Sequence, residues 1–210
     1  YTVDGIHSEE YFIEKISYTL KDSIKLQLRS DVPLGSHLSG GIDSSLVSKL
    51  ASDHLGSAIP LFHGKFSESP AYDESKYARI ISDATKGILH EVIPSAKEFI
   101  EIVPKLIYAM DEPVAGPGLF PQYSVSKLAK EHVKVVLGGQ GGDELFGGYA
   151  RYLVGYLEQA LKGAIYETHE EGEHLVSLHS IVPHLPVLKQ YVPLLSQFWE
   201  KGLFGDICLL

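Results

Sequence analysis

The chain has 210 residues, of which 44% are apolar and 21% are charged, and its formal net charge is −9. This composition is typical of a globular protein, and the acidic balance argues against a general nucleic-acid or membrane-surface binder. The single cysteine, Cys208, excludes an internal disulfide and a Cys-based zinc site and fits the reducing cytoplasm, and no apolar run is long enough to predict a membrane span.

Apolar periodicity and turn residues predict alternating helices and strands up to about residue 150. A first helix is expected over residues 8–29, where an apolar residue recurs every four positions. The other predicted helices cover residues 46–55, 73–86 and 122–132, and one more begins at the capping box 95–98. The predicted strands cover residues 32–38, 59–66, 88–93 and 133–137.

This alternation predicts a parallel sheet with helices on both faces, in which ligands bind beyond the carboxyl ends of the strands. In the helix over 73–86 the predicted buried face consists of Tyr77, Ile80, Ile81 and Ala84. After residue 150 no strand pattern continues. The sequence therefore predicts an α/β domain over 1–150 and a mainly helical continuation over 151–210.

The segment Ser39–Ser45 reads S-G-G-I-D-S-S and joins a predicted strand to a predicted helix. The backbone N–H groups of such a turn and the positive end of the helix dipole favour a phosphate group. The pattern is neither the Walker sequence nor the dinucleotide fingerprint. An ordinary capped helix start is the alternative interpretation.

A second glycine-rich segment, Gly138–Tyr149, follows the last predicted strand and has six glycines in twelve residues. That many glycines are costly in chain entropy, which suggests that another group must approach the backbone closely. Asp143 is placed to share a metal ion with Asp43, because Mg²⁺ is usually held by one or two carboxylates and substrate phosphates. A flexible loop that caps the next helix is the alternative.

These two segments, together with A-Y-D-E-S-K-Y-A-R at residues 71–79 and D-E-P at 111–113, resemble the synthetase domain of the glutamine-hydrolysing asparagine synthetases and their relative β-lactam synthetase. The resemblance covers residues 8–151. It implies an adenine-nucleotide α-hydrolase-like fold, a PP-loop ATP pyrophosphatase. It also implies a ligase that uses ATP and Mg²⁺ to adenylate the side-chain carboxylate of aspartate, which ammonia then converts to asparagine.

The resemblance also implies roles for individual residues. Asp43 and Asp143 would hold Mg²⁺, and these two residues and Gln140 are the candidate catalytic residues. A loop over residues 111–121 would lie near the amino-acid substrate. The residues expected to bind the nucleotide are Leu38, Ser39, Gly40, Gly41, Asp43, Ser44, Ser45, Gly64, Gly138 and Gly139.

The chain departs from the family pattern in three places. The glutaminase domain with its catalytic cysteine does not precede Tyr1, so this domain is expected as a partner in the full-length protein. Gln140 stands where family members have glutamate or tyrosine, and an amide cannot act as a base. No lysine in an R-x-K context follows Arg151, which predicts a C-terminally truncated domain.

Two alternatives to asparagine synthesis follow from these departures. One is a related adenylating amidotransferase that acts on a peptide or antibiotic precursor, and the other is a non-catalytic nucleotide-binding module. No nucleic-acid or membrane partner is expected, a cytoplasmic location is expected, and a homo-oligomer is left open. His37, in the strand before the first glycine loop, is predicted to be a hydrogen-bonded core residue.

Overall fold

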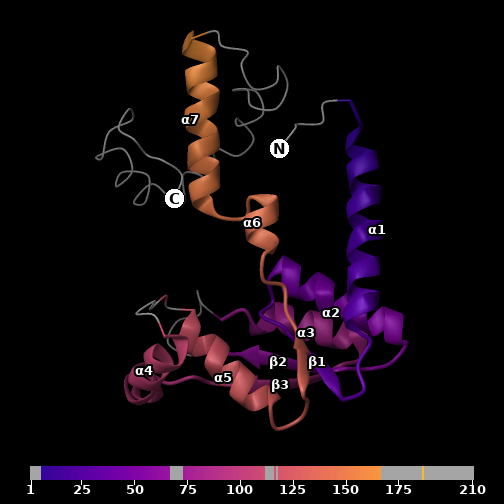
Figure 1. Cartoon of the computed structure of the whole chain (residues 1–210), viewed down its shortest axis with the longest axis vertical. Coiled ribbons are helices and arrows are strands. Elements are labelled where there is room, and N and C mark those ends of the chain that lie inside the picture. The colour runs from indigo at the N-terminus through magenta and orange to yellow at the C-terminus, as the bar shows by residue number, and fades with distance from the viewer. Residues whose placement is uncertain (1–5, 67–72, 112–115, 117, 167–185, 187–210) are drawn as a thin grey trace. The chain divides into compact units, whose positions relative to one another are not determined.

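The protein is described here by a computed structural model that covers residues 6–66, 73–111, 116, 118–166 and 186 (Figure 1). It contains two compact units, and each is described by itself. One unit is Glu14–Gln140, and the other combines Tyr1–Ile13 with Gly141–Leu210. The domain boundary predicted at residue 150 stays a prediction, and the predicted helices after residue 166 lie outside the described residues.

The helices and strands alternate as the sequence predicts. The helix predicted over 122–132 begins three residues earlier, because Pro121 is tolerated in a first turn, where its missing N–H needs no partner. In chain order the elements are α1 (Glu9–Gln27), β1 (Leu34–His37), α2 (Ile42–Leu55), β2 (Pro60–Gly64), α3 (Ser75–Thr85), β3 (Ile88–Val92), α4 (Ala96–Met110), α5 (Leu119–Ala129), β4 (Val135–Leu137), α6 (Gly142–Phe146) and α7 (Ala150–Tyr166).

The four strands form one parallel sheet in the order β3-β2-β1-β4, which confirms the predicted fold class. The chain runs outward from β1 through β2 to β3 and then returns to place β4 on the other side of β1. The strand order therefore reverses between β1 and β4. In open α/β sheets the crevice beyond the carboxyl ends of such a pair is where ligands bind, and the two glycine-rich segments follow those two strands.

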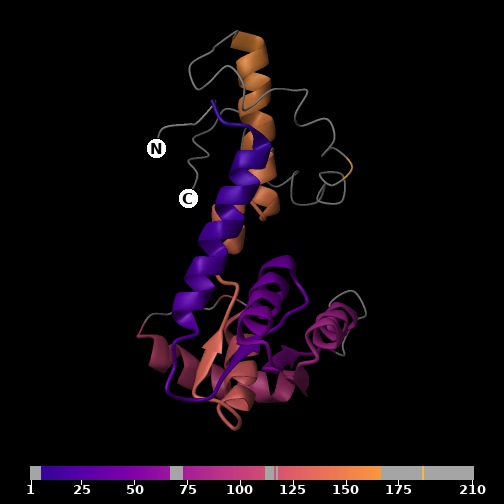
Figure 2. The same ribbon diagram turned by 90° about the vertical axis from the view of Figure 1, so that its right-hand side faces the viewer.

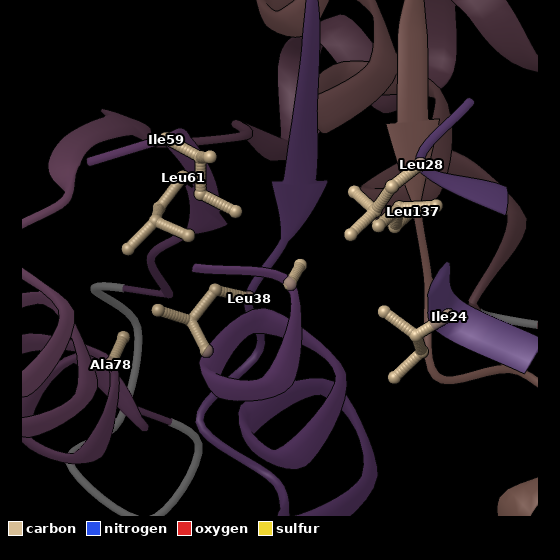
Figure 3. Close-up of a cluster of buried hydrophobic side chains, with 8 residues drawn as sticks. Ile24, Leu28, Leu38, Ile59, Leu61, Ala78 and Leu137 are labelled. Atoms are coloured by element: carbon tan, nitrogen blue, oxygen red, sulfur yellow. The ribbon is translucent and has the colours of Figure 1, made fainter. Parts of the chain in front are cut away.

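One face of the sheet packs against α1, α2 and α3 (Figure 3). Leu38 and Leu61 are completely buried there, and Ala78 of α3 contributes to the same cluster. Leu137 of β4 packs against Ile24 and its neighbours from α1. The predicted apolar stripe of α1 is thus buried only at its C-terminal end.

The other face of the sheet is covered by α5, so helices lie on both faces as predicted (Figure 2). Phe62 of β2 is completely buried against Val125 and Ala129 of α5. Val135 and Val136 are only half-buried, although the sequence predicts a strand buried on both faces. The reason is that β4 forms an edge of the described sheet.

The buried face of α3 differs from the prediction. Tyr77 and Ile80 are 55% and 54% exposed, although the pattern predicts that both are buried. Ala84 is exposed as well, whereas Ile81 is half-buried against the core cluster as predicted. The fully buried residues of α3 are small: Ser75, Ala78, Ser82 and Thr85. Three of them carry hydroxyl groups, and these groups find hydrogen-bond partners within the fold. Small side chains let α3 approach β2 and α2 closely, which an apolar-periodicity rule cannot recognise.

In the second unit, the cluster around Val154 on α7 includes Tyr156 and Leu157. The rings of Tyr149 and Tyr152 meet edge to face, 5.5 Å apart. Within the described ranges, no helix combines the length and the apolar character that crossing a membrane requires.

His37 differs from the expected satisfied core histidine. The register pairs it with Phe62, so the alternation of side chains along a strand places its ring on the apolar α5 face. Its Nε2 atom is buried and has no hydrogen-bond partner among the described residues. Burial lowers the pKa of His37 below its ordinary value. A buried imidazole nitrogen that lacks a hydrogen-bond partner in these apolar surroundings lowers the free energy of unfolding.

A second histidine on this face is similarly placed. The ring of His90 in β3 stacks on Phe62, and its centroid lies 3.9 Å from that of His132. Burial lowers the pKa of His90 most, and the charge of the neighbouring His132 lowers it further. Both histidines therefore resist protonation in the folded state.

We expect Gly35→Ala to lower the free energy of unfolding by about 1–3 kcal/mol, the usual cost of overpacking a core. A Cβ at Gly35 would lie 2.7 Å from Cε2 of Phe62 and 2.7 Å from the carbonyl oxygen of Pro60. Urea unfolding monitored by circular dichroism measures the change. Gly116→Ala is the matched control, because a Cβ there meets no atom within 4 Å. Equal stability of the two variants would contradict the packing described for β1 and β2.

We expect the free energy of unfolding to fall as the pH drops from about 7.5 to 5.5. The unfolded chain takes up protons at histidine near pH 6.5, whereas His37 and His90 have lowered pKa values in the folded state. Stability that is fully present above about pH 6.5 is therefore lost on acidification. His37→Phe should flatten this dependence and should add about 1 kcal/mol at pH 7.5, because it removes an unpaired nitrogen.

Urea titrations of wild type and variant at both pH values test this expectation. The same substitution at the exposed His54 is the control and should not stabilise the protein. A pH dependence that is identical in wild type and His37→Phe would show that His37 is paired or protonated in the fold.

Candidate functional site

The segment Ser39–Ser45 forms the connection between β1 and the first turn of α2, as predicted. Gly40 has a φ of 100°, a left-handed conformation that favours glycine. Gly41 is the N-cap residue of α2 and has an extended backbone with a φ of −68° and a ψ of 162°. The chain therefore turns sharply at Gly40 and enters the helix immediately afterwards.

Hydroxyl groups inside the loop hold this turn. Ser39 Oγ accepts a hydrogen bond from the N–H of Gly41 at 3.1 Å and lies 3.0 Å from Ser44 Oγ. The N–H of Ser39 donates to Ser44 Oγ, and Ser44 Oγ contacts the carbonyl oxygen of Gly41 at 3.2 Å. The side chains of Ser39 and Ser44 thus serve the loop itself, and the phosphate-binding role predicted for them stays a prediction.

The first turn of α2 is not capped by a side chain. Within the described part of the chain, the N–H groups of Ile42, Asp43 and Ser44 find no acceptor, whereas the N–H of Ser45 bonds to the carbonyl oxygen of Gly41. The carboxylate of Asp43 and the hydroxyl of Ser45 likewise have no hydrogen-bond partner among the described residues. Unpaired N–H groups at the positive end of a helix form an anion-binding site.

The second glycine segment packs directly on this helix start. A Cβ at Gly139 would lie 2.6 Å from the backbone nitrogen of Ser44 and 2.9 Å from Cβ of Asp43. On another side of the loop, a Cβ at Gly40 would lie 2.8 Å from the carbonyl oxygen of Glu74. The number of glycines in the second segment predicted that another group approaches its backbone closely. For Gly139 this group is the start of α2, in the same unit.

A chain of buried, hydrogen-bonded hydroxyl groups connects the helix after the loop to the sheet. Ser48 Oγ lies 2.7 Å from the carbonyl oxygen of Ser44 and 2.9 Å from Ser36 Oγ. Ser36 Oγ in turn contacts the carbonyl oxygen of Leu137 at 3.4 Å. Ser36 and Ser48 are completely buried, so these bonds tie β1, α2 and β4 together beneath the site. No feature of the sequence predicted this network.

A buried histidine that the sequence reasoning missed lies beside the loop. His63 of β2 is 1% exposed. Its Nδ1 lies 2.8 Å from the carbonyl oxygen of Leu38, and its Nε2 lies 3.1 Å from Ser75 Oγ. The N–H of Ser75 donates to a carboxylate oxygen of Asp73 at 3.0 Å. Hydrogen bonds from the hydroxyl and the backbone of Ser75 hold the pKa of Asp73 below its ordinary value.

Three other residues predicted to bind the nucleotide, Leu38, Gly64 and Gly138, lie at the same edge of the sheet. The side chain of Leu38 belongs to the core, and its N–H donates to the carbonyl oxygen of Phe62 at 2.9 Å. Gly64 ends β2, where a Cβ would lie 3.0 Å from Cγ2 of Val125. Gly138 follows β4. Their role in nucleotide binding stays a prediction.

Gln140 is exposed and ends the unit that contains the loop. Asp143 lies in the first turn of α6, in the other unit, so its predicted pairing with Asp43 stays a prediction. Within its own unit Asp143 is crowded by Gly148, where any Cβ would overlap its carboxylate. The hydroxyl of Tyr149 donates to Glu144 at 2.6 Å, and this bond lowers the pKa of Glu144 and raises that of Tyr149.

The described residues contain no group of three His, Cys, Asp or Glu side chains arranged to hold a metal ion. The predicted Mg²⁺ site has a different composition, with two carboxylates and the phosphate oxygens of the substrate. The free carboxylate of Asp43 beside unpaired N–H groups suits that composition. Residues 112–115 and 117 of the loop predicted over 111–121 lie outside the described residues, as do Ala71 and Tyr72 of the third matching segment. Residues 119–121 belong to α5 and not to a loop.

A cavity of about 400 Å³ lies elsewhere, between α4, α5 and the end of β3. Its walls include Phe120 and Leu128 together with Glu98, Glu101 and Lys127. Phe120 belongs to the segment 111–121 that the sequence places near the amino-acid substrate, whereas the residues predicted to bind the nucleotide and the metal ion do not line the cavity.

Comparison with known proteins identifies the family. The chain matches the asparagine synthase family over residues 15–198. A relative from Methanocaldococcus jannaschii is 39% identical over 161 residues, which cover 72% of this chain and 29% of that protein. Asparagine synthetase [glutamine-hydrolyzing] 1 of Bacillus subtilis is 38% identical over 148 residues, 69% of this chain and 22% of that enzyme. Asparagine synthetase B of Escherichia coli is 29% identical over 179 residues, 79% of this chain and 31% of that enzyme.

Among solved structures, the NH3-dependent NAD synthetase of Campylobacter jejuni is similar with a TM-score of 0.43 and 18% identity, over 65% of this chain and 60% of that one. This similarity adds nothing about function. The chain spans less than a third of the length of the curated relatives named above. The parallel sheet, the S-G-G-I-D-S-S loop at its switch point and the match over residues 15–198 together place this chain in the asparagine synthase family.

Proposed function

We propose that this chain is the ATP-binding synthetase part of a glutamine-hydrolysing asparagine synthetase. In this proposal it activates the side-chain carboxylate of aspartate with ATP in the cytoplasm and passes the activated acid to ammonia. Family membership and the names of the Bacillus and Escherichia relatives support the reaction type. A glutaminase domain of the full-length protein would supply the ammonia.

One observation carries the nucleotide-binding part of the proposal. The two glycine segments meet at the start of α2, where Gly139 packs on Asp43 and Ser44. This contact puts the uncapped first turn of α2 at the switch point of the sheet. Unpaired N–H groups, a helix N-terminus and two backbone segments without side chains suit a polyphosphate.

The proposed chemistry has two steps. An oxygen of the aspartate side chain attacks the α-phosphorus of ATP, and the bond from that phosphorus to the oxygen that bridges to the β-phosphorus breaks. Pyrophosphate leaves, and β-aspartyl-AMP remains. Ammonia then attacks the acyl carbon, loses a proton, and displaces AMP to give asparagine. The N–H groups of the α2 turn would stabilise the charge that develops on the leaving pyrophosphate.

In this proposal Asp43, with Asp143 as the predicted second carboxylate, holds Mg²⁺. The metal ion would neutralise phosphate charge in the transition state. Gln140 would lie near the reacting groups as a hydrogen-bonding residue without acid–base function, because an amide does not titrate. The identity of Gln140 also supports the alternative of a related amidotransferase that acts on another carboxylic acid.

We expect Gly139→Ala to weaken Mg-ATP binding by at least about tenfold, because the added methyl group would displace the start of α2 from its position. Isothermal titration calorimetry on the purified protein measures the affinity. Gly56→Ala is the control. Gly56 has a left-handed φ of 62°, so this control is strained by its backbone conformation, but it lies at the far end of α2 in open space. Equal affinity in the two variants would remove the Gly139 contact from the site.

We expect Asp43→Ala to weaken binding of Mg-ATP more than binding of ATP in the presence of EDTA, because only the first complex uses the carboxylate as a metal ligand. The comparison is made by calorimetry with and without Mg²⁺. Asp53→Ala is the control, since Asp53 is an exposed aspartate on the same helix whose partner is Lys49. If Mg-ATP binds Asp43→Ala as tightly as wild type, Asp43 is not a metal ligand.

We expect aspartate to stimulate pyrophosphate release from ATP, and ammonia to yield asparagine and AMP in equal amounts. A coupled pyrophosphate assay with a panel of amino acids and peptide acids measures the specificity. Release with another acid but not with aspartate would favour the alternative amidotransferase. ATP binding without release in the presence of any acid would favour a nucleotide-binding module.

A further inference from the structure

His63 occupies a position that the proposed chemistry does not use. It is the largest polar side chain that is completely buried beside the loop, and it has hydrogen-bond contacts on both ring nitrogens. One contact is to the carbonyl oxygen of Leu38, the residue immediately before Ser39. The other is to the hydroxyl of Ser75, the first residue of α3. His63 therefore bridges the entrance of the loop and the start of another helix.

The contact with Leu38 determines which ring nitrogen carries hydrogen. A carbonyl oxygen can only accept, so Nδ1 of His63 must donate to it. Nε2 lies against the hydroxyl of Ser75, which also interacts with the carboxylate of Asp73. The backbone of Ser75 is held at the start of α3, because its N–H donates to Asp73.

The Ser75–His63 pair resembles a nucleophile with its base, since the two atoms lie within hydrogen-bond reach. Burial excludes that role, because Ser75 is 2% exposed and His63 is 1% exposed. No substrate reaches either side chain in this fold. The contribution of the pair is therefore to hold together the two segments that it joins, the entrance of the loop and the start of α3.

Those segments meet at the anion-binding turn. Gly40 packs on Glu74, the residue before Ser75, and leaves no room for a Cβ. The loop is thus fixed to α3 at two points, by backbone packing at Gly40 and by the His63 bridge behind Leu38. In contrast, its first turn of N–H groups remains unpaired among the described residues.

We propose that His63 is a positioning residue that fixes the loop Ser39–Ser45 against the N-terminus of α3, so that its N–H groups are oriented for pyrophosphate before the nucleotide arrives. The proposal rests on the proposed function for its link to ATP. Its geometric part, the fixing of the loop, concerns the nucleotide-free protein. A rigid loop pays its ordering cost during folding and not during binding.

Binding measurements test the link to pyrophosphate. His63→Leu removes both hydrogen bonds and should weaken binding of Mg-ATP and of inorganic pyrophosphate by about tenfold, with adenosine affinity changed less than twofold. His63→Asn keeps a donor near the Nδ1 position and should recover part of the loss. Equal losses for ATP, pyrophosphate and adenosine would indicate a general structural defect and would contradict the proposal.

Ser75→Ala and Ser82→Ala form a matched pair on the two ends of α3. Both remove a buried hydroxyl, but Ser82 bonds to the carbonyl oxygen of Gly87, far from the loop along the chain. Only Ser75→Ala should weaken pyrophosphate binding. Urea unfolding of both variants shows whether any difference in affinity merely follows a difference in stability.

Hydrogen exchange of the nucleotide-free protein separates this proposal from the proposed function. The hydrogen-bonded amides of Ser39, Gly41 and Ser45 should exchange several-fold faster in His63→Leu than in wild type, and those of α5 should not change. Nitrogen-15 NMR of the wild-type ring should show hydrogen on Nδ1. Unchanged exchange, or hydrogen on Nε2 alone, overturns the role of His63. Failure of the wild type to bind ATP overturns the proposed function, and the exchange result still decides whether His63 fixes the loop.

Discussion

The structure depends on one close approach of backbone to backbone at the start of α2. Gly139 lies against the amide nitrogen of Ser44, and Gly40 lies against the carbonyl oxygen of Glu74. A side chain at either position would push apart elements that the site needs in contact. The parallel sheet makes the approach attainable, because β1 and β4 end side by side where the strand order reverses. Glycine at these positions therefore reflects packing within the fold as well as room for a ligand.

This approach leaves polar groups beneath the loop that must be paired, and serine provides the partners. Ser36 and Ser48 are buried in the apolar side of the sheet, yet their hydroxyls bond to each other and to carbonyl oxygens of α2 and β4. Satisfied hydroxyls cost little and fix geometry, whereas unsatisfied ones would destabilise the core. Among the described residues, the N–H groups of Ile42 and Asp43 at the start of α2 remain unpaired, which suits an anion.

The sequence predicted the chain order of the elements up to β4 and the two loops, because each depends on local periodicity or on glycine chemistry. It did not predict the short helix α6 within the second glycine segment. It also did not predict the fully buried face of α3, since Tyr77 and Ile80 fit an apolar pattern while the helix packs through Ser75, Ala78 and Ser82. Close packing between helix and strand requires small residues, and two of these are serines whose hydroxyls find partners within the fold, so hydrophobic periodicity does not detect them. The role of Asp143 with Asp43 also lies beyond local signals, because it requires the placement of two separate compact units.

His37 and His63 illustrate why a lone histidine in an apolar strand cannot be interpreted from sequence. They occupy neighbouring strands at nearly the same level, with His37 paired in register to Phe62. Side chains alternate along a strand, so His63 points to the α3 side and finds Leu38 and Ser75, while His37 points to the α5 side and leaves Nε2 unpaired. A one-residue difference in position thus separates a fully bonded histidine from an unsatisfied one. The partners of His63 come from residues 25 and 12 positions away along the chain, and only the completed sheet brings them together. Because the bonded histidine is the one beside the anion-binding turn, order at that turn is a property of the tertiary fold and not of the glycine motif alone.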